Sequence, residues 1–294
     1  MKITMVKLVL FLTLFTNIAL SANENTYVRL IKSIDYSVHD RDKPQSTTIY
    51  NYDKKNRLDH MIIHMSDYPD MNSSIQNIYN DKNDLVQVIS TSKVGSPQNP
   101  TTQKVSNLFH YSGDRIIKQV SSSNGKIQTE TNVIEWKGEM PIKSIMKIYN
   151  TQEKLVQLHT YHLDYKDNNI FHQEVAIEHL DYNQTTSTII DIQYGDQKSS
   201  EYYVNEGNFY LNPLGMSYPK IILKSHSSSK IFKNGKQEYS SDDSSTYNTT
   251  YNEKGLPVSI EIINNLATGE NRSYTVYEYE EFKNLSGVQP DINR

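Results

Sequence analysis

The sequence predicts an all-β protein: a long antiparallel meander of degenerate hairpin repeats that forms a curled open sheet or a barrel-like structure. Three observations favour this fold class. Short stretches alternate apolar and polar residues, which is the period of a half-buried strand. The chain has 22 tyrosines against 7 phenylalanines and 1 tryptophan, and tyrosine suits a pleated surface with one packed and one wet side. Polar turn residues separate the alternating stretches.

The first 22 residues have the features of a secretory signal peptide. Lys2 and Lys7 give a basic start, Val9 to Phe15 begin an apolar run, and small residues follow it. The alternative is a membrane anchor, but polar residues interrupt the run and it is shorter than a bilayer span of about 20 residues. We therefore expect a signal peptide over residues 1–22 and a single repeat-containing all-β domain over residues 23–294, exported to the periplasm or secreted.

Composition excludes several classes of function. The chain has no cysteine, which removes disulfides, zinc–thiolate sites and a thiol nucleophile. Its formal net charge is −4, and no block of Lys or Arg gives a footprint for nucleic acid. No later stretch approaches the apolar length of a spanning segment. We expect no nucleic-acid partner, and no transmembrane segment in the mature chain.

One phrase, clearest at Ile49–Ile63, organises the chain. Thr47 to Tyr52 favour a strand, Asp53 to Asn56 supply turn chemistry, and Arg57 to Met65 return as the partner strand, which predicts a β-hairpin. Looser versions recur at irregular spacing, so we predict degenerate hairpin units rather than a solenoid of strict period. The aromatic residues predicted to anchor these units are Tyr50, Tyr52, Tyr79, Tyr111, Tyr149, Tyr165 and Tyr251.

Polar stretches between the units read as connections. Ser90 to Val105 is the longest of them, and Ser240 to Ser245 is predicted to be a turn. Asn205 to Pro219 breaks the strand rhythm and is predicted to form an irregular cover or a short helical turn.

Three landmarks carry a resemblance to known proteins: Tyr50–Leu58, Asn212-Pro213-Leu214 and Gly255-Leu256-Pro257. The first resembles the YD repeat of RHS-type proteins, whose strands form long antiparallel spirals or sheets. The three together are similar to secreted Bacteroidetes-type β-domains of unknown function. Most units here lack the glycine of the repeat, and the lipoprotein cysteine is absent. The resemblance implies a fold and brings no catalytic residues.

No pattern in the sequence indicates a metal or cofactor. His60 and His64 lie roughly 13 Å apart along one strand, too far to chelate one ion. His159 and His162 point to opposite faces of a regular strand. The acidic clusters, such as Asp164–Asp167, lack the spacing of a calcium loop. We expect scattered surface histidines, solvated turn carboxylates and no cofactor.

Catalytic signatures are also missing. The chain has no G-x-S-x-G nucleophile elbow. Carboxylates that face each other across strands leave no sequence signature, so a polysaccharide-acting hydrolase using paired carboxylates stays open. The tyrosines could present a flat surface to a protein or glycan, although the structural role is favoured, because cross-strand aromatic pairs contribute roughly 0.2–1 kcal/mol each.

These observations favour the interpretation that the chain is an exported, non-catalytic protein with a binding or envelope-associated role. Its expected partner is a protein or a glycan in the envelope or the extracellular space, and neutralisation of a periplasmic toxin is one specific form. Two alternatives stand beside it: the hydrolase, and a self-assembling structural repeat protein.

Overall fold

The computed structural model describes residues 17–19, 26–37, 40–68, 71–96, 99–167, 169–199, 220–266 and 269–283. Most of the predicted signal peptide and the whole stretch Asn205–Pro219, with its Asn212-Pro213-Leu214 landmark, lie outside these residues. The predicted division into residues 1–22 and 23–294 stays a prediction. The strands are β1 (Asn17–Ala19), β2 (Thr26–Ser37), β3 (Asp40–Tyr52), β4 (Leu58–Met65), β5 (Ser73–Tyr79), β6 (Leu85–Ser96), β7 (Asn99–Ser112), β8 (Arg115–Ser123), β9 (Lys126–Lys137), β10 (Met140–Tyr149), β11 (Leu155–Lys166), β12 (Asn169–His179), β13 (Gln184–Lys198), β14 (Lys220–Lys233), β15 (Lys236–Tyr251), β16 (Pro257–Leu266) and β17 (Gly269–Lys283).

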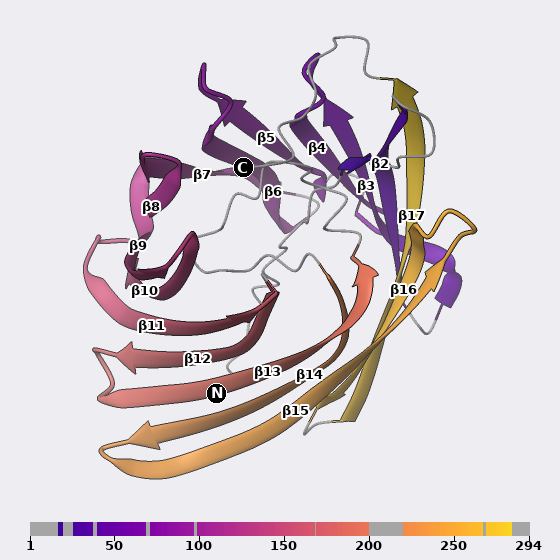
Figure 1. Ribbon diagram of the computed structural model, residues 1–294. Coiled ribbons are helices and arrows are strands. Elements are labelled where there is room, and N and C mark those ends of the chain that lie inside the picture. Colours follow the sequence, from indigo (N-terminus) through magenta and orange to yellow (C-terminus); the bar gives the residue numbers. More distant parts are fainter. Residues whose placement is uncertain are drawn as a thin grey trace.

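Strands β2 to β17 form a closed barrel of sixteen antiparallel strands (Figure 1). Each strand pairs with the next one along the chain, and β17 pairs with β2 over Ser273–Lys283, which closes the ring. β2 extends beyond β3, and its residues 27–29 pair with β1. The predicted all-β antiparallel meander is confirmed, and of the two forms left open, the sheet adopts the barrel. Closure removes the exposed edges that an open sheet of this size would present.

Two predicted connections are strands instead. Ser240–Ser245 lies inside β15, where Ser245 donates a hydrogen bond to Asn264 of β16 at 2.7 Å. Ser90–Val105 forms the end of β6 and the start of β7, which pair from Gln87↔Leu108 to Ser96↔Asn99. The local sequence predicts turns here, because serine and threonine are common in turns. In a closed barrel each strand has a partner on both sides, and the backbone ladder outweighs the weak local preference.

Alternate residues of the wall are buried and face the interior. Leu30, Tyr50, Leu58 and Met61 form one buried cluster near β2–β4, with Tyr277 among the rings packed against it. Polar residues share the inner face: Ser33, Thr48 and Gln173 are buried as well. Charge is rare there, and Asp35 accepts hydrogen bonds from the hydroxyls of Ser46 and Thr275.

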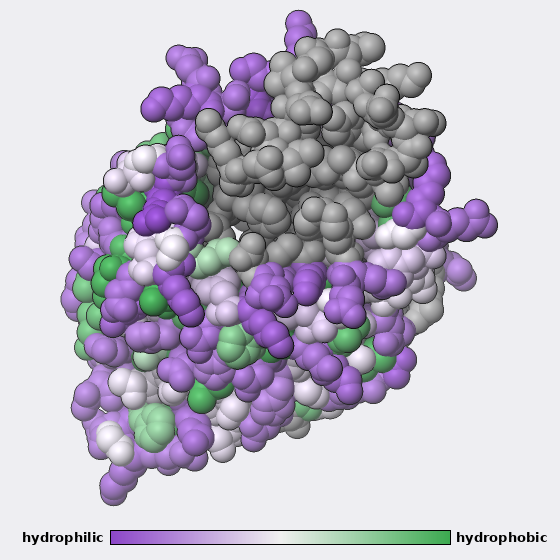
Figure 2. Space-filling view, viewed as in Figure 1, coloured by the Kyte–Doolittle hydropathy of each residue, from purple (hydrophilic) through white to green (hydrophobic). Residues whose placement is uncertain are grey.

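The outer face carries cross-strand ion pairs. Lys32, next to the buried Ser33, lies directly opposite Glu278, and their charged groups are 2.7 Å apart. Further pairs join Arg29 with Glu280, Lys118 with Glu130, Lys143 with Glu135 and Arg272 with Glu261. On the side of the molecule that Figure 2 presents, hydrophilic residues predominate, and hydrophobic residues are scattered among them rather than joined into a band.

Candidate functional site

The turns that lead from odd-numbered to even-numbered strands gather at one end of the barrel, which we call the first rim. It includes the β3–β4, β5–β6, β7–β8, β9–β10, β11–β12 and β15–β16 connections. The turns that lead from even to odd strands, such as β10–β11, form the second rim. This separation decides which of the predicted hairpin units are neighbours in space.

Four of the predicted anchoring tyrosines occupy one repeated position at the first rim. Tyr52, Tyr79, Tyr111 and Tyr165 lie near the end of an odd strand, each beside a register shift that lets two residues face one. Their hydroxyls donate hydrogen bonds of 2.7 to 2.9 Å to backbone carbonyls of the preceding even strand, at Leu30, Leu58, Leu85 and Pro141. The bond spans 21 to 26 residues of sequence. We call this contact the tyrosine latch.

The other three predicted tyrosines differ in place or contact. Tyr251 lies at the equivalent end of β15, opposite Pro257. Tyr50 points into the barrel, where its hydroxyl is 3.1 Å from the Ser33 hydroxyl. Tyr149 lies at the second rim, and its hydroxyl donates to a carboxylate oxygen of Glu130 at 3.2 Å. The anchoring role of all seven stays a prediction, which the variant Tyr111→Phe proposed below tests at one of them.

Sequence reasoning missed three members of the repeated position. Tyr194 and Tyr279 donate from the ends of β13 and β17 to the carbonyls of Ile170 and Pro257. Trp136 takes the same place near the end of β9, opposite Pro141. The hairpin phrase does not mark these residues, because Lys, Gly and Glu follow the rings at positions 136, 194 and 279, where the phrase has Asp53 after Tyr52. The available signal was the recurrence of an aromatic residue near the end of every second strand.

The turn chemistry predicted for the hairpin phrase is present in four turns. Asp53, Asn80, Asn150 and Asn252 each use one side-chain oxygen to accept two backbone N–H groups, two and four residues later. Such bonds let a short polar side chain replace missing backbone partners. The fourth turn residue has positive φ in each case: Asn56, Asn83, Glu153 and Gly255.

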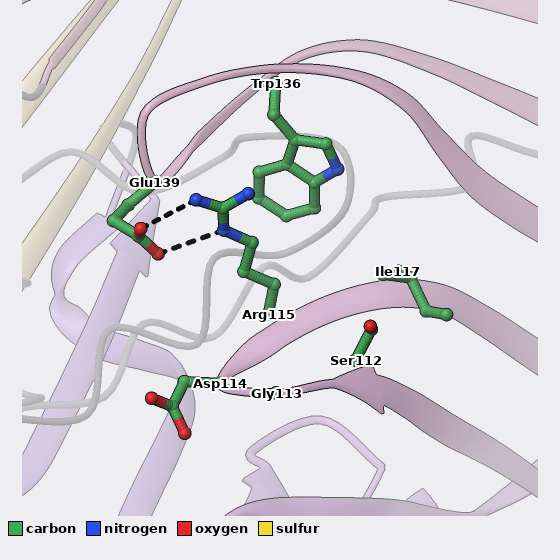
Figure 3. A pocket seen from close by; sticks show the side chains of 7 residues that line it. All are labelled: Ser112, Gly113, Asp114, Arg115, Ile117, Trp136 and Glu139. Atoms are coloured by element: carbon green, nitrogen blue, oxygen red, sulfur yellow. Dashed lines mark hydrogen bonds and ion pairs between the residues drawn. The ribbon is translucent and has the colours of Figure 1, made fainter.

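A pocket of about 420 Å³ opens where the latch pattern changes (Figure 3). Two neighbouring two-residue turns build it, Gly113-Asp114 between β7 and β8 and Gly138-Glu139 between β9 and β10. Both glycines have φ near +60°, the left-handed conformation that this turn position requires. The turns thereby place Asp114 and Glu139 at equivalent positions on adjacent hairpins. Ser112, Gly113, Asp114, Arg115, Ile117, Trp136 and Glu139 line the pocket.

Arg115 links the two turns of the pocket. Its guanidinium donates two hydrogen bonds to Glu139, from Nη2 at 2.8 Å and from Nε at 3.2 Å. Its guanidinium carbon also lies 5.2 Å from the centre of the Trp136 ring, within cation–π range. Figure 3 shows Arg115 between Trp136 and the Gly113-Asp114 turn. The hydrogen bond with Arg115 holds the pKa of Glu139 below its usual range.

Arg115 belongs to a repeated arrangement of arginine over an aromatic ring. Arg29 lies over Tyr52 at 4.7 Å and Arg57 over Tyr79 at 4.2 Å. In those two units the ring is a latched tyrosine. Tryptophan has no hydroxyl, so the ring at position 136 cannot form the latch to the carbonyl of Ile116. A departure from a repeated local rule, such as a ring without the hydroxyl of the latch, often marks a functional site.

At the pocket, Glu139 does not suit the role of general acid in hydrolysis by paired carboxylates. Such a mechanism needs one carboxylic acid whose raised pKa keeps it protonated near neutral pH. Glu139 has the opposite shift because the guanidinium stabilises its ionised form. Within the described residues, no three side chains of the His, Asp and Glu type converge as metal ligands. His60 and His172 instead contact carboxylates on their own or neighbouring strands.

These features define a class: closed antiparallel β-barrels of sixteen strands. No family model and no curated protein matches the chain. The chain is similar to the crystal structure of a porin-like protein from Bacteroides vulgatus, with a TM-score of 0.41, 11% identity, and coverage of 85% of this chain and 98% of that one. A porin-like protein from Bacteroides uniformis gives a TM-score of 0.36, 10% identity, and coverage of 85% and 98%. The resemblance to YD-repeat proteins stays a prediction.

The prediction that the mature chain has no transmembrane segment is wrong. It rests on the lack of a long apolar run, which is the signature of a spanning helix. The strands close into a barrel instead, and a closed barrel satisfies its backbone hydrogen bonds internally, which lets strands span a bilayer without a long apolar run.

The described residues contain no helix of the length and apolar character required to cross a membrane.

Proposed function

We propose that this chain is an exported, non-catalytic β-barrel of the outer membrane that presents a ligand-binding pocket at its first rim. The observation that carries the proposal is closure: sixteen antiparallel strands, an even number, pair around the whole ring. Strands β6 to β17 have 9 to 16 residues, and a tilted strand of about 9–11 residues is enough to span a bilayer.

The pocket supports a binding role rather than a catalytic one. Two of its charged groups, Arg115 and Glu139, are already engaged with each other through two hydrogen bonds. A bonded pair of this kind can orient a ligand, while the pairing keeps Glu139 from acting as a general acid. Closure also argues against the self-assembling repeat, since the paired strands β2–β17 leave no long edge to template another chain. Neutralisation of a toxin stays a prediction.

Fractionation of cells that express the full chain tests the proposal. We expect the protein in the outer-membrane fraction after an alkaline carbonate wash. We also expect its mobility on a denaturing gel to change when the sample is heated, as a detergent-resistant barrel unfolds. The outer-membrane location could readily fail this test, because the outer wall carries charged side chains. Each charge at the middle of a lipid-facing strand costs roughly 2–4 kcal/mol. Quantitative release into the aqueous fraction would overturn the outer-membrane location.

A further inference from the structure

The pocket beside Trp136 has the residue chemistry of a saccharide site. We propose that it binds one neutral sugar residue of a glycan, an inference that rests on the proposed binding role of this rim. Its volume of about 420 Å³ falls in the range of roughly 300–1,000 Å³ typical of small-molecule sites.

The apolar part of the pocket suits the C–H face of a sugar ring. Trp136 of β9 and Ile117 of β8 both line the pocket, and Ile117 is 39% exposed. One face of a pyranose ring presents mainly C–H groups, which pack against an indole ring or an aliphatic side chain. A ring of this kind covers exposed apolar surface on two adjacent strands at once.

The polar part of the pocket suits the hydroxyl groups at the edge of the sugar ring. Ser112, Asp114 and the Arg115–Glu139 pair all line the pocket (Figure 3). The pair is planar and offers neighbouring donors and acceptors, which matches the vicinal hydroxyls of a sugar. Because Arg115 and Glu139 hold each other in place, little side-chain freedom is lost when a ligand binds.

Charge selects a neutral ligand over an anion. Two residues with carboxylates, Asp114 and Glu139, and one with a guanidinium, Arg115, line the pocket. An anionic ligand would meet a net negative site, and its acid group would compete with Glu139 for Arg115, the one cation among the described residues that line the pocket. A quaternary ammonium ligand is disfavoured for a different reason, because the Arg115 guanidinium beside the Trp136 ring would repel a second cation there.

The departure from the repeat supports the same assignment. Trp136 has no hydroxyl to donate to the Ile116 carbonyl. Tyr79 and Tyr111 do donate such a hydrogen bond to the preceding strand. Tryptophan offers the largest flat surface of any side chain. The exchange of a stabilising hydroxyl for a broad ring is expected where the surface contacts a ligand.

The single tryptophan makes the test site-specific, because all indole fluorescence of the chain comes from Trp136. The purified full barrel is titrated with maltose, cellobiose and lactose as neutral probes, and with glucuronate, inorganic phosphate and choline as charged ones. We expect a saturable change in emission with at least one neutral disaccharide and none with the charged probes. The absence of any response to the three disaccharides, or saturable binding of a charged probe alone, would overturn the proposal.

Variants separate the pocket from the rest of the rim. Glu139→Gln should lower the affinity for the disaccharide at least tenfold. Trp136→Tyr should lower the affinity, measured by calorimetry, by a similar factor. Glu281→Gln is the matched control, since it removes an exposed ion pair with Lys254 elsewhere on this rim, and it should leave the affinity unchanged. Equal loss in all three variants would overturn the pocket assignment. Fractionation remains a separate test, so failure of sugar binding and failure of the membrane location can be distinguished.

Discussion

At the scale of single residues, the barrel is organised by a tyrosine hydroxyl that bonds to a backbone carbonyl of the neighbouring strand. The latch of Tyr111 to the Leu85 carbonyl, at 2.8 Å, joins two hairpins that are successive in sequence. Its acceptor residue is buried, with Leu85 6% exposed. A hydrogen bond to such a carbonyl matters mainly because the carbonyl would otherwise lose a partner in a place that water reaches poorly.

Tyr111→Phe should therefore destabilise the barrel by about 0.5–1.5 kcal/mol, because it removes the hydroxyl and keeps the ring. The midpoint of unfolding in denaturant measures the change. Tyr182→Phe is the control, since Tyr182 lies in the β12–β13 turn and is 71% exposed. Equal midpoints for Tyr111→Phe and the parent chain would contradict a stabilising role of the latch.

Trp136→Tyr should stabilise the barrel, in contrast to Tyr111→Phe, although it lowers the affinity for the sugar. A tyrosine at this position can offer its hydroxyl to the Ile116 carbonyl, as its counterparts do to theirs, for a gain of about 0.5–1.5 kcal/mol. Trp136→Phe isolates that hydroxyl, because it makes the same change of ring size without the donor. If the two variants unfold at the same midpoint, no latch forms at this position.

The ionised state of Glu139 predicts how sugar affinity depends on pH. The hydrogen bond from Arg115 lowers the pKa of Glu139, so the pair is intact above the usual carboxyl pKa of about 4.3. It is lost as pH falls through the lower value of the folded protein. Affinity measured by Trp136 fluorescence should be flat from pH 8 to 5 and decline only in stronger acid. A decline centred near pH 6 would point to another group.

At the scale of elements, four hairpins share one turn conformation, in which the fourth residue has positive φ. The residues at this position differ in how well they tolerate that conformation. Asn56, Asn83 and Gly255 all tolerate positive φ, whereas Glu153 adopts φ +60° in the β10–β11 turn with a longer side chain. An ordinary L-residue in the left-handed region is less stable by roughly 1–2 kcal/mol. Asparagine is one of the few side-chain-bearing residues that visit this region routinely.

Glu153→Asn should accordingly raise the stability of the barrel by up to about 1 kcal/mol. The gain is the difference in backbone preference, reduced by loss of the 3.3 Å bond from the Ile127 amide to the Glu153 carboxylate. Glu253→Asn provides the comparison, because Glu253 lies in the related β15–β16 turn without positive φ. Thermal unfolding of the two variants is the measurement, and a gain of the same size in both would contradict the backbone explanation.

At the scale of the whole molecule, stability depends on closure between segments at opposite ends of the sequence. β17 pairs with β2 along eleven residue pairs, from Ser273↔Ser37 to Lys283↔Thr26. Ion pairs such as Lys32–Glu278 lie on this seam. Without β17, the remaining sheet would expose β2 and β16 as edges, and long unpaired edges promote association.

A chain that ends at Leu266 should therefore form soluble aggregates or oligomers, while a chain that ends at Lys283 keeps every described strand and should behave like the parent. Light scattering coupled to size-exclusion chromatography, in the same detergent, distinguishes them. A monodisperse product of the size of one chain from the shorter variant would show that β2–β16 can fold without closure.

The sequence by itself determined the all-β class, the antiparallel hairpin order and the turns at Asp53, Asn80, Asn150 and Asn252, because alternation and turn chemistry are local. Closure of the barrel, the strand at Ser240–Ser245 and the split of the tyrosines between two rims depended on the tertiary structure. The pocket did too, since its residues come from two turns about 25 residues apart that only strand pairing brings together. Residues that share a role through long-range pairing carry no common local phrase, and this is why Trp136 was missed.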